Sequence, residues 1–277
     1  MPYTERIDPI PELFAHMPTR YPELNGKVAI ITGSSRGIGL AIAVRFAREG
    51  MRVVINSRSE EDVARVVGDL QALGVEVLGV AADLGEQTAL QSLFDRTLER
   101  FGTVDVLVNN AASLRRKPLF DIPDELFESQ LQTNIAAPYY LSRLTALHLQ
   151  QQGKGGSIIN ISSIGSIQAH IPALPYDMTK TALNMLTMAM ATELGRKGIR
   201  VNAIAPGSIR TYEVSGEERT RWEKSQTRIP LLRSGEPAEI ASVAAFLASD
   251  EASYINGVVL PVDGGVLSQL HPPGEPI

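Results

Sequence analysis

Two side chains that can exchange protons, Tyr176 and Lys180, lie four positions apart. Positions i and i+4 share one face of a helix, so we expect the two side chains to be neighbours. A free tyrosine has a pKa of about 10, and a nearby ammonium group stabilises the phenolate and lowers that pKa. The spacing therefore predicts that Tyr176 is a general acid or base tuned by Lys180. A simple surface pair on a helix is the alternative.

A glycine-rich loop lies near the start of the chain, at Thr32-Gly33-Ser34-Ser35-Arg36-Gly37-Ile38-Gly39. Glycine permits positive φ and lets the backbone approach a phosphate closely. The N-terminus of a following helix adds unpaired N–H groups and a partial positive charge. Between a strand and a helix, such a loop is typical of dinucleotide binding, whereas a plain tight turn is the structural alternative.

Short apolar runs alternate with amphipathic segments from Lys27 onward. This alternation shows where the glycine-rich loop and the Tyr176/Lys180 pair lie in the predicted fold. The predicted strands are 28–32, 52–56, 76–80, 105–109, 157–161, 200–204 and 257–261. The predicted helices are 37–49, 60–73, 86–101, 124–151, 175–197 and 237–248. This alternation predicts an α/β fold, a doubly wound seven-stranded parallel sheet (Rossmann fold) in a single domain. Tyr176 then follows the fifth strand, at the edge where such sheets bind ligands.

Further motifs follow in an order that resembles the short-chain dehydrogenase/reductase (SDR) family. After Thr32 the glycine spacing is Gly-x-x-x-Gly-x-Gly, and the fourth strand ends at Asn109-Asn110-Ala111-Ala112. Pro206-Gly207 follows the sixth strand. Ala112 stands where the family has a glycine, so the local backbone departs from the family pattern there. The resemblance covers residues 25–266.

The resemblance implies a catalytic tetrad of Asn134, Ser163, Tyr176 and Lys180. Ser163 lies 13 residues before Tyr176, as the family's catalytic serine does, and would hold the substrate oxygen. Its neighbour Ser162 is the alternative. Lys180 would also bind a ribose, and Asn134 would position a water that links Lys180 to solvent. No metal is needed for this chemistry.

The resemblance also implies which residues bind NADP or NAD. They come from the glycine loop and from the ends of the later strands: Gly33, Ser35, Arg36, Gly37, Ile38, Gly39, Asn56, Ser57, Arg58, Asp83, Leu84, Asn110, Ala111, Ala112, Tyr176, Lys180, Pro206, Gly207, Ile209 and Thr211. Asp83 would contact the adenine, and Thr211 the nicotinamide carboxamide.

The end of the second strand bears on the choice between the two cofactors. An acidic residue there would bind the ribose 2′-OH of NAD, but the chain reads Val54-Ile55-Asn56-Ser57-Arg58. The guanidinium of Arg58 could instead bind the 2′-phosphate of NADP, with Arg36 as a second cation. We therefore expect NADP to be preferred and NAD to be the second choice. The alternative is that Arg58 points to solvent beside Glu60 and Glu61.

Composition excludes several other functions. The 277 residues are 44% hydrophobic and 21% charged, and the net charge of −5 lacks the basic surplus of a nucleic-acid binder. The chain has no cysteine, which excludes disulfides and thiolate chemistry and suits the cytoplasm. The four histidines follow no metal-ligand spacing, and no apolar stretch is long enough for a membrane span.

Three segments fall outside the regular pattern. Residues 1–24 are expected to be an N-terminal extension, either an extended arm on the body or a neighbouring subunit, or a frayed end. Residues 208–235 are expected to be a substrate lid, in which Trp222 would cover substrate or anchor the segment. Residues 267–277 are expected to be an irregular tail. The basic run 115–117 is interpreted as a solvated loop, with contact to an acyl-carrier or phosphorylated substrate as the alternative.

Together these features predict an oxidoreductase that moves a hydride between NADP(H) or NAD(H) and a carbonyl or secondary alcohol. The sequence resembles the group that contains 3-oxoacyl-acyl-carrier-protein reductases, sugar dehydrogenases and gluconate-type dehydrogenases. A non-catalytic dinucleotide sensor or scaffold, or a cofactor-retaining epimerase or dehydratase, is the alternative. We expect a cytoplasmic homotetramer with a small-molecule substrate and neither nucleic-acid nor membrane partners.

Overall fold

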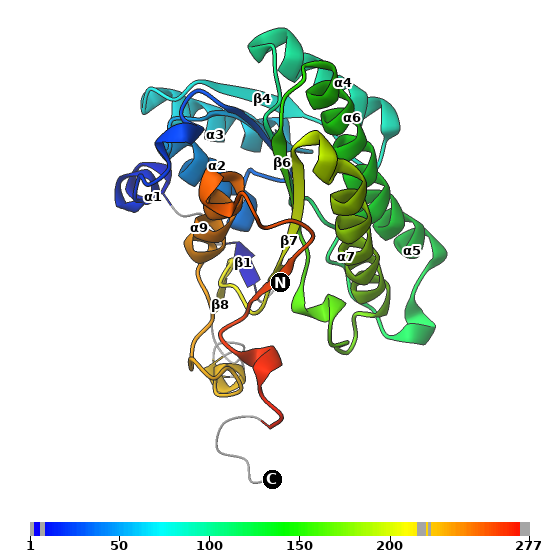
Figure 1. Ribbon diagram of the computed structural model, residues 1–277. Coiled ribbons are helices and arrows are strands. Elements are labelled where there is room, and N and C mark those ends of the chain that lie inside the picture. Colours follow the sequence, from blue (N-terminus) through cyan, green and yellow to red (C-terminus); the bar gives the residue numbers. More distant parts are fainter. Residues whose placement is uncertain (1–2, 6–8, 215–219, 221–222, 272–277) are drawn as a thin grey trace.

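The computed structural model describes residues 3–5, 9–214, 220 and 223–271 (Figure 1). Its centre is a parallel sheet with the order β4-β3-β2-β5-β6-β7-β9. The strands are β2 (Val28–Ile31), β3 (Arg52–Ser57), β4 (Val77–Ala81), β5 (Val106–Asn109), β6 (Gly156–Ile161), β7 (Ile199–Pro206) and β9 (Val259–Val262). Each strand lies within two residues of its predicted bounds, and the predicted fold class is confirmed.

Helices cover both faces of the sheet because successive residues of each strand point to opposite sides (Figure 1). Ala29 and Ile31 of β2 pack in the core with α2 (Gly37–Arg48), α3 (Glu60–Ala72) and α9 (Pro237–Ala248). Val28 and Ile30 pack in the core with α4 (Gln87–Phe101), α6 (Ala137–Gln151) and α7 (Leu174–Leu194). Burial on both faces explains why the strands read as continuous apolar runs.

The sequence predicts one helix over 124–151, but the structure interrupts it. Helix α5 (Asp124–Leu131) ends in a π-helical turn at Gln132–Ala136, and α6 continues from there. A π-helical turn carries an additional residue without ending the helix, so the apolar spacing still reads as continuous, and such turns are common at functional sites. Asn134 lies in this turn.

The N-terminal segment is more ordered than an extended arm. Residues Ile10–His16 form helix α1, which packs against α2 and α3. A strand β1 (Tyr3–Glu5) pairs antiparallel with β8 (Tyr212–Val214), which begins directly after Thr211. Trp222 lies outside the described residues. No described helix has the length and hydrophobicity to cross a membrane.

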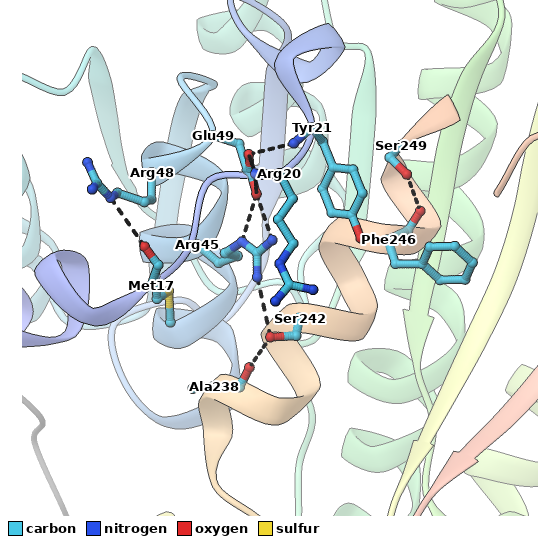
Figure 2. Close-up of polar contacts among 10 residues, drawn as sticks. All are labelled: Met17, Arg20, Tyr21, Arg45, Arg48, Glu49, Ala238, Ser242, Phe246 and Ser249. Atoms are coloured by element: carbon cyan, nitrogen blue, oxygen red, sulfur yellow. Dashed lines mark hydrogen bonds and ion pairs between the residues drawn. The ribbon is translucent and has the colours of Figure 1, made fainter. Parts of the chain in front are cut away.

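The buried carboxylate of Glu49 anchors the N-terminal segment to the rest of the protein (Figure 2). Glu49, at the end of α2, accepts hydrogen bonds from the backbone N–H groups of Arg20 (2.9 Å) and Tyr21 (3.0 Å). The guanidinium of Arg45 donates to the same carboxylate at 2.9 and 2.6 Å, and both side chains of the pair are buried. Arg45 also donates to Ser242 Oγ of α9 at 3.3 Å. One ion pair therefore joins the N-terminal segment, α2 and α9.

Candidate active site

Helix α7 brings Tyr176 and Lys180 together on one buried face. The Lys180 Nζ lies 5.7 Å from the centroid of the Tyr176 ring, and the two residues are 2% and 6% exposed. Helix α7 begins just before Pro175, a residue suited to the first turn because its missing N–H has no helical partner there. The predicted pair is therefore placed side by side near the carboxyl end of β6.

The electrostatics of the pair differ from the sequence-based expectation. Burial raises the pKa of Tyr176, and a hydrogen bond with Ser163 and the charge of Arg116 oppose this rise without cancelling it. Burial also lowers the pKa of Lys180 to about 8. The Lys180 Nζ donates to the carbonyl oxygen of Ile161 at 2.7 Å. The expected lowering of the Tyr176 pKa is thus wrong for this state of the protein, because desolvation outweighs the nearby cations.

The two adjacent serines after β6 have different surroundings. The Ser163 hydroxyl accepts a hydrogen bond from Gly165 N at 3.0 Å and interacts with the Tyr176 hydroxyl. Ser162 is buried, and its hydroxyl donates to Asn184 Oδ1 at 2.6 Å in the interior. Of the two, Ser163 is the serine whose hydroxyl is directed to Tyr176.

Asn134 joins the loop after β5 to α7. Its Nδ2 donates to Thr179 Oγ1 (3.0 Å) and to the carbonyl oxygen of Ser113 (3.2 Å), and its Oδ1 accepts from Ser113 N (2.8 Å). Thr179 Oγ1 in turn donates to the carbonyl oxygen of Tyr176 at 2.7 Å. The side chain thus fixes the framework around Tyr176, and the water that Asn134 would position remains a prediction.

The carboxylate of Asp177, a residue that the sequence analysis did not identify, holds the loop between Ser163 and Tyr176. Asp177 Oδ2 accepts a hydrogen bond from His170 N at 2.9 Å, and its Oδ1 lies 3.1 Å from His170 Nδ1. A Cβ on Gly165 would overlap Asp177 Oδ1, so a glycine is needed where this carboxylate enters the loop. No motif in the sequence could have identified this contact, because it depends on how the loop folds back.

The glycine loop has the space and polarity that a phosphate requires. Gly33 and Gly37 adopt φ values of 61° and 54°, and a Cβ on Gly39 would overlap the Gly33 carbonyl oxygen. Asn110 Nδ2 donates to the carbonyl oxygens of Thr32 (2.9 Å) and Gly33 (3.0 Å), which ties the loop to the end of β5. Helix α2 begins at Gly37 without a side-chain cap or an acidic first turn. Its N–H groups and dipole are therefore suited to a pyrophosphate.

The residues predicted for the cofactor's ribose differ in exposure. Asn56 is buried, where its Nδ2 donates to the carbonyl oxygens of Val80 and Ala82 and its Oδ1 accepts from Gly33 N. Arg58 is exposed at the end of β3, and the Ser57 hydroxyl caps the Ser59 N–H group at 3.3 Å.

Two arginines lie at the glycine loop. Arg36 is exposed within the loop itself. Arg65 of α3, which the sequence did not indicate, donates to the carbonyl oxygen of Ser35 at 3.1 Å.

The remaining predicted cofactor residues line the carboxyl edge of the sheet. Ala111 N donates to Thr32 Oγ1, Gly207 N donates to the Val262 carbonyl oxygen, and Ile209 bridges to Gly235. Asp83 is exposed and accepts from Gly85 N, Leu84 is buried, and Ala112, Ile38 and Pro206 lie along the same edge. The Thr211 methyl group would be 3.3 Å from a Cβ on Gly37. Because the strand connections diverge between β2 and β5, this edge is the position where doubly wound folds bind ligands.

An exposed arginine that the sequence placed in a solvated loop lies beside Tyr176. The Arg116 Cζ is 5.9 Å from the centroid of the Tyr176 ring. Gln130 of α5 is fully buried and donates to the carbonyl oxygens of Ser113 (3.3 Å) and Arg115 (2.8 Å). The loop is therefore held next to the tyrosine instead of extending freely into solvent.

The chain is similar to known proteins over most of its length. The family model described as "Enoyl-(Acyl carrier protein) reductase" matches residues 33–267. Dehydrogenase/reductase SDR family member 4 of Bos taurus is 38% identical over 89% of each chain, and L-rhamnose 1-dehydrogenase (NAD(P)(+)) of Azotobacter vinelandii is 39% identical over 88% of this chain and 98% of its own. A putative short-chain alcohol dehydrogenase from Sinorhizobium meliloti 1021 superposes with a TM-score of 0.85 at 35% identity, covering 91% of this chain and 100% of that structure.

The fold and these matches define a class of proteins. The chain belongs to the short-chain dehydrogenase/reductase family. It is an oxidoreductase that acts on CH–OH groups, and dehydrogenases of this family generally use NAD(P).

Proposed function

We propose that this enzyme transfers a hydride between NADP(H) or NAD(H) and a carbonyl or secondary alcohol, with Tyr176 as the general acid or base. The observation that carries the proposal is the position of Tyr176, which lies beside Ser163, Lys180 and Arg116 at the same sheet edge as the glycine loop. A non-catalytic sensor would not need this buried phenol and ammonium pair, whose desolvation is costly.

Ser163 and Tyr176 would have different roles in proton transfer. When bound, the nicotinamide supplies or accepts the hydride. The Ser163 hydroxyl would hold the substrate oxygen next to the Tyr176 hydroxyl. In reduction Tyr176 donates its proton to that oxygen, and in alcohol oxidation it removes the proton. Because burial raises the pKa of Tyr176, the cofactor-free site holds the tyrosine in its acid form.

Lys180 is suited to a second role in this scheme. Its pKa of about 8 leaves it largely protonated near neutral pH, and the ammonium group has three N–H donors. One of them is directed to the Ile161 carbonyl oxygen. The others would bind the ribose and favour the phenolate of Tyr176 during alcohol oxidation.

The proposed cofactor preference is NADP. The end of β3 has no acidic residue to repel a 2′-phosphate, and Arg58 is exposed there. Arg65 holds the glycine loop from the neighbouring helix and adds positive charge on the same side. Glu60 and Glu61, in the first turn of α3, are the charges that would oppose this preference.

We also propose a cytoplasmic homotetramer. Helix α7 exposes Met178, Met185 and Met188, and α6 exposes Tyr139 and Leu147. Apolar side chains on two neighbouring helices favour contact with another subunit. A chain without cysteine suits a reducing compartment.

A cofactor-coupled screen of alcohols, polyols and 3-oxo esters with both cofactors tests the proposed function. We expect turnover of at least one class and a loss of about 100-fold or more in kcat for Tyr176→Phe. Tyr254→Phe, at a fully exposed position, is the matched control and should keep wild-type rates. Cofactor binding without turnover of any substrate would favour the sensor, and cofactor that stays bound through purification would favour the epimerase or dehydratase.

A further inference from the structure

Two cations approach Tyr176, and they differ in their access to solvent. Lys180 is buried, and its ammonium donates one hydrogen bond to the Ile161 carbonyl oxygen. Arg116 is exposed, and its guanidinium carbon lies 5.9 Å from the Tyr176 ring centroid. The proton-transfer chemistry described above uses only Lys180. Arg116 is therefore an additional cation beside Tyr176, and its side chain is open to solvent.

The backbone next to Arg116 is fixed by buried amides. Gln130 donates to the carbonyl oxygens of Ser113 and Arg115, and Asn134 hydrogen-bonds both the N–H and the carbonyl oxygen of Ser113. Surface loops are usually more mobile than the elements that they connect. Here two side chains from α5 and the π-helical turn hold the residues just before Arg116, so its side chain starts from a defined point beside the catalytic tyrosine.

Within the described part of the chain, no carboxylate forms an ion pair with Arg116. Asp177, which follows Tyr176, directs its carboxylate to the His170 backbone and ring. A guanidinium has five N–H donors and matches the two oxygens of a carboxylate in a bidentate geometry. The position beside Tyr176 therefore offers an anion-binding group close to the reacting atoms.

We propose that Arg116 binds a carboxylate of the substrate, so that the preferred substrates are hydroxy acids and the corresponding oxo acids. The inference rests on the proposed function, in which Ser163 and Tyr176 hold the reacting oxygen. Arg116 lies beside the tyrosine that would hold the reacting oxygen of the substrate. A substrate carboxylate bound by Arg116 would therefore be only a few bonds from the reacting carbon.

Matched substrates test this assignment. The wild-type enzyme is assayed in the oxidative direction with a six-carbon aldonate and with the alditol of the same length, which differs in lacking the carboxylate. We expect a higher kcat/KM for the aldonate. Arg116→Ala should raise the KM for the aldonate about 10- to 100-fold, the size expected for a charge-assisted hydrogen bond, and leave the KM for the alditol unchanged. Arg116→Lys should have an intermediate KM, because it keeps the charge and loses the bidentate geometry.

Arg115→Ala is the matched control, because it removes a neighbouring exposed guanidinium from the same loop. It should leave both substrates unaffected. If Arg116 served only to tune Tyr176, then Arg116→Ala would lower kcat for both substrates equally and shift the pH profile of both. That result, or a wild-type preference for the alditol, overturns the assignment.

A binding experiment separates this inference from the proposed function. The cofactor-loaded Tyr176→Phe variant is titrated with the aldonate by calorimetry, and the Tyr176→Phe/Arg116→Ala variant is titrated in the same way. We expect the second variant to bind at least 10-fold more weakly. Equal affinities overturn the role of Arg116 even if Tyr176 is catalytic. Full activity of Tyr176→Phe would instead overturn the proposed function while leaving the difference in binding intact.

Discussion

The ammonium of Lys180 lies 2.7 Å from the carbonyl oxygen of Ile161, the last residue of β6. Ser163 follows two residues later, so the same strand end holds the lysine and presents the serine. The buried ammonium of Lys180 therefore has a backbone acceptor for one of its hydrogen bonds. Among the residues that the structure describes, no carboxylate forms an ion pair with Lys180, so this carbonyl oxygen is the partner that the structure shows for its charge.

The burial of Lys180 predicts a pH-dependent stability difference from Lys180→Met. Burial lowers the pKa of Lys180 from 10.5 to about 8, so below pH 8 the lysine is charged in both the folded and the unfolded state and the folded state bears the full desolvation cost. Between these values the unfolded state binds more protons, so the stability of the wild type relative to the variant should rise with pH. Between pH 7.5 and pH 10 the rise should be about 2 kcal/mol. Denaturant unfolding of both proteins at pH 7.5 and pH 10 measures it, and a constant difference would contradict the burial.

The burial of Tyr176 predicts that its phenolate is absent below pH 10 in the cofactor-free enzyme. Desolvation raises the pKa of this phenol above its ordinary value of 10.0. An ultraviolet titration of wild type and Tyr176→Phe should therefore differ only above that pH. A phenolate signal near neutrality that the variant lacks would refute the prediction.

Alcohol oxidation should become faster as the pH rises, because the phenolate is the base that removes the substrate proton. The rate has to be measured together with a substrate deuterium isotope effect, since slow product release would hide the trend. An oxidation rate that stays constant between about pH 6 and 10 while the isotope effect is full would contradict the role of Tyr176.

Arg58 should decide between the two cofactors. Arg58→Ala should raise the KM for NADP about 10-fold or more, because a charge-assisted hydrogen bond contributes about 1.5–3 kcal/mol. The KM for NAD should change little, since NAD has no 2′-phosphate. Arg196→Ala, which removes an exposed arginine just before β7 at the opposite edge of the sheet, is the control. Equal weakening of both cofactors by Arg58→Ala would reject the proposed preference.

The buried pair of Arg45 and Glu49 should contribute strongly to stability. Glu49→Gln leaves the guanidinium without its charge partner, and breaking a buried pair in this way typically costs about 3–5 kcal/mol. The exposed pair of Arg233 and Glu239 offers a comparison, and Glu239→Gln should cost much less stability than Glu49→Gln because solvent screens an exposed pair. Denaturant unfolding gives both values. Limited proteolysis should also cut the N-terminal segment faster in Glu49→Gln, and unchanged proteolysis would show that the pair does not anchor it.

Local pattern was sufficient to predict the sheet, because its strands are buried on both faces and read as apolar runs between glycines. The helix Ile10–His16 was missed because Pro9 and Pro11 flank its start and the segment is short. The π-helical turn around Asn134 was invisible because one additional residue does not disturb the apolar spacing of the helices on either side.

Residues of the candidate site that belong to a sequence motif could be predicted. Residues and properties of the site that depend on tertiary packing could not. Tyr176 and Lys180 could be named from their spacing, and Ser163 from the resemblance to the family. The placement of Arg116 depends on a buried amide at Gln130, and the raised pKa of Tyr176 depends on desolvation. Neither the placement of Arg116 nor the raised pKa of Tyr176 could be predicted from the local sequence.

Helix α9 packs against α2 (Figure 1). The hydrogen bond from Arg45 to Ser242 joins residues 197 positions apart in the chain (Figure 2). Because α2 begins at the glycine loop, a loop synthesised early is supported by a helix that leaves the ribosome near the end of translation. Until then the surface of α2 that contacts α9 lacks this covering. A nascent chain arrested before Pro237 should therefore be a substrate for chaperones, and this side of the fold should be among the last parts to become protected during synthesis.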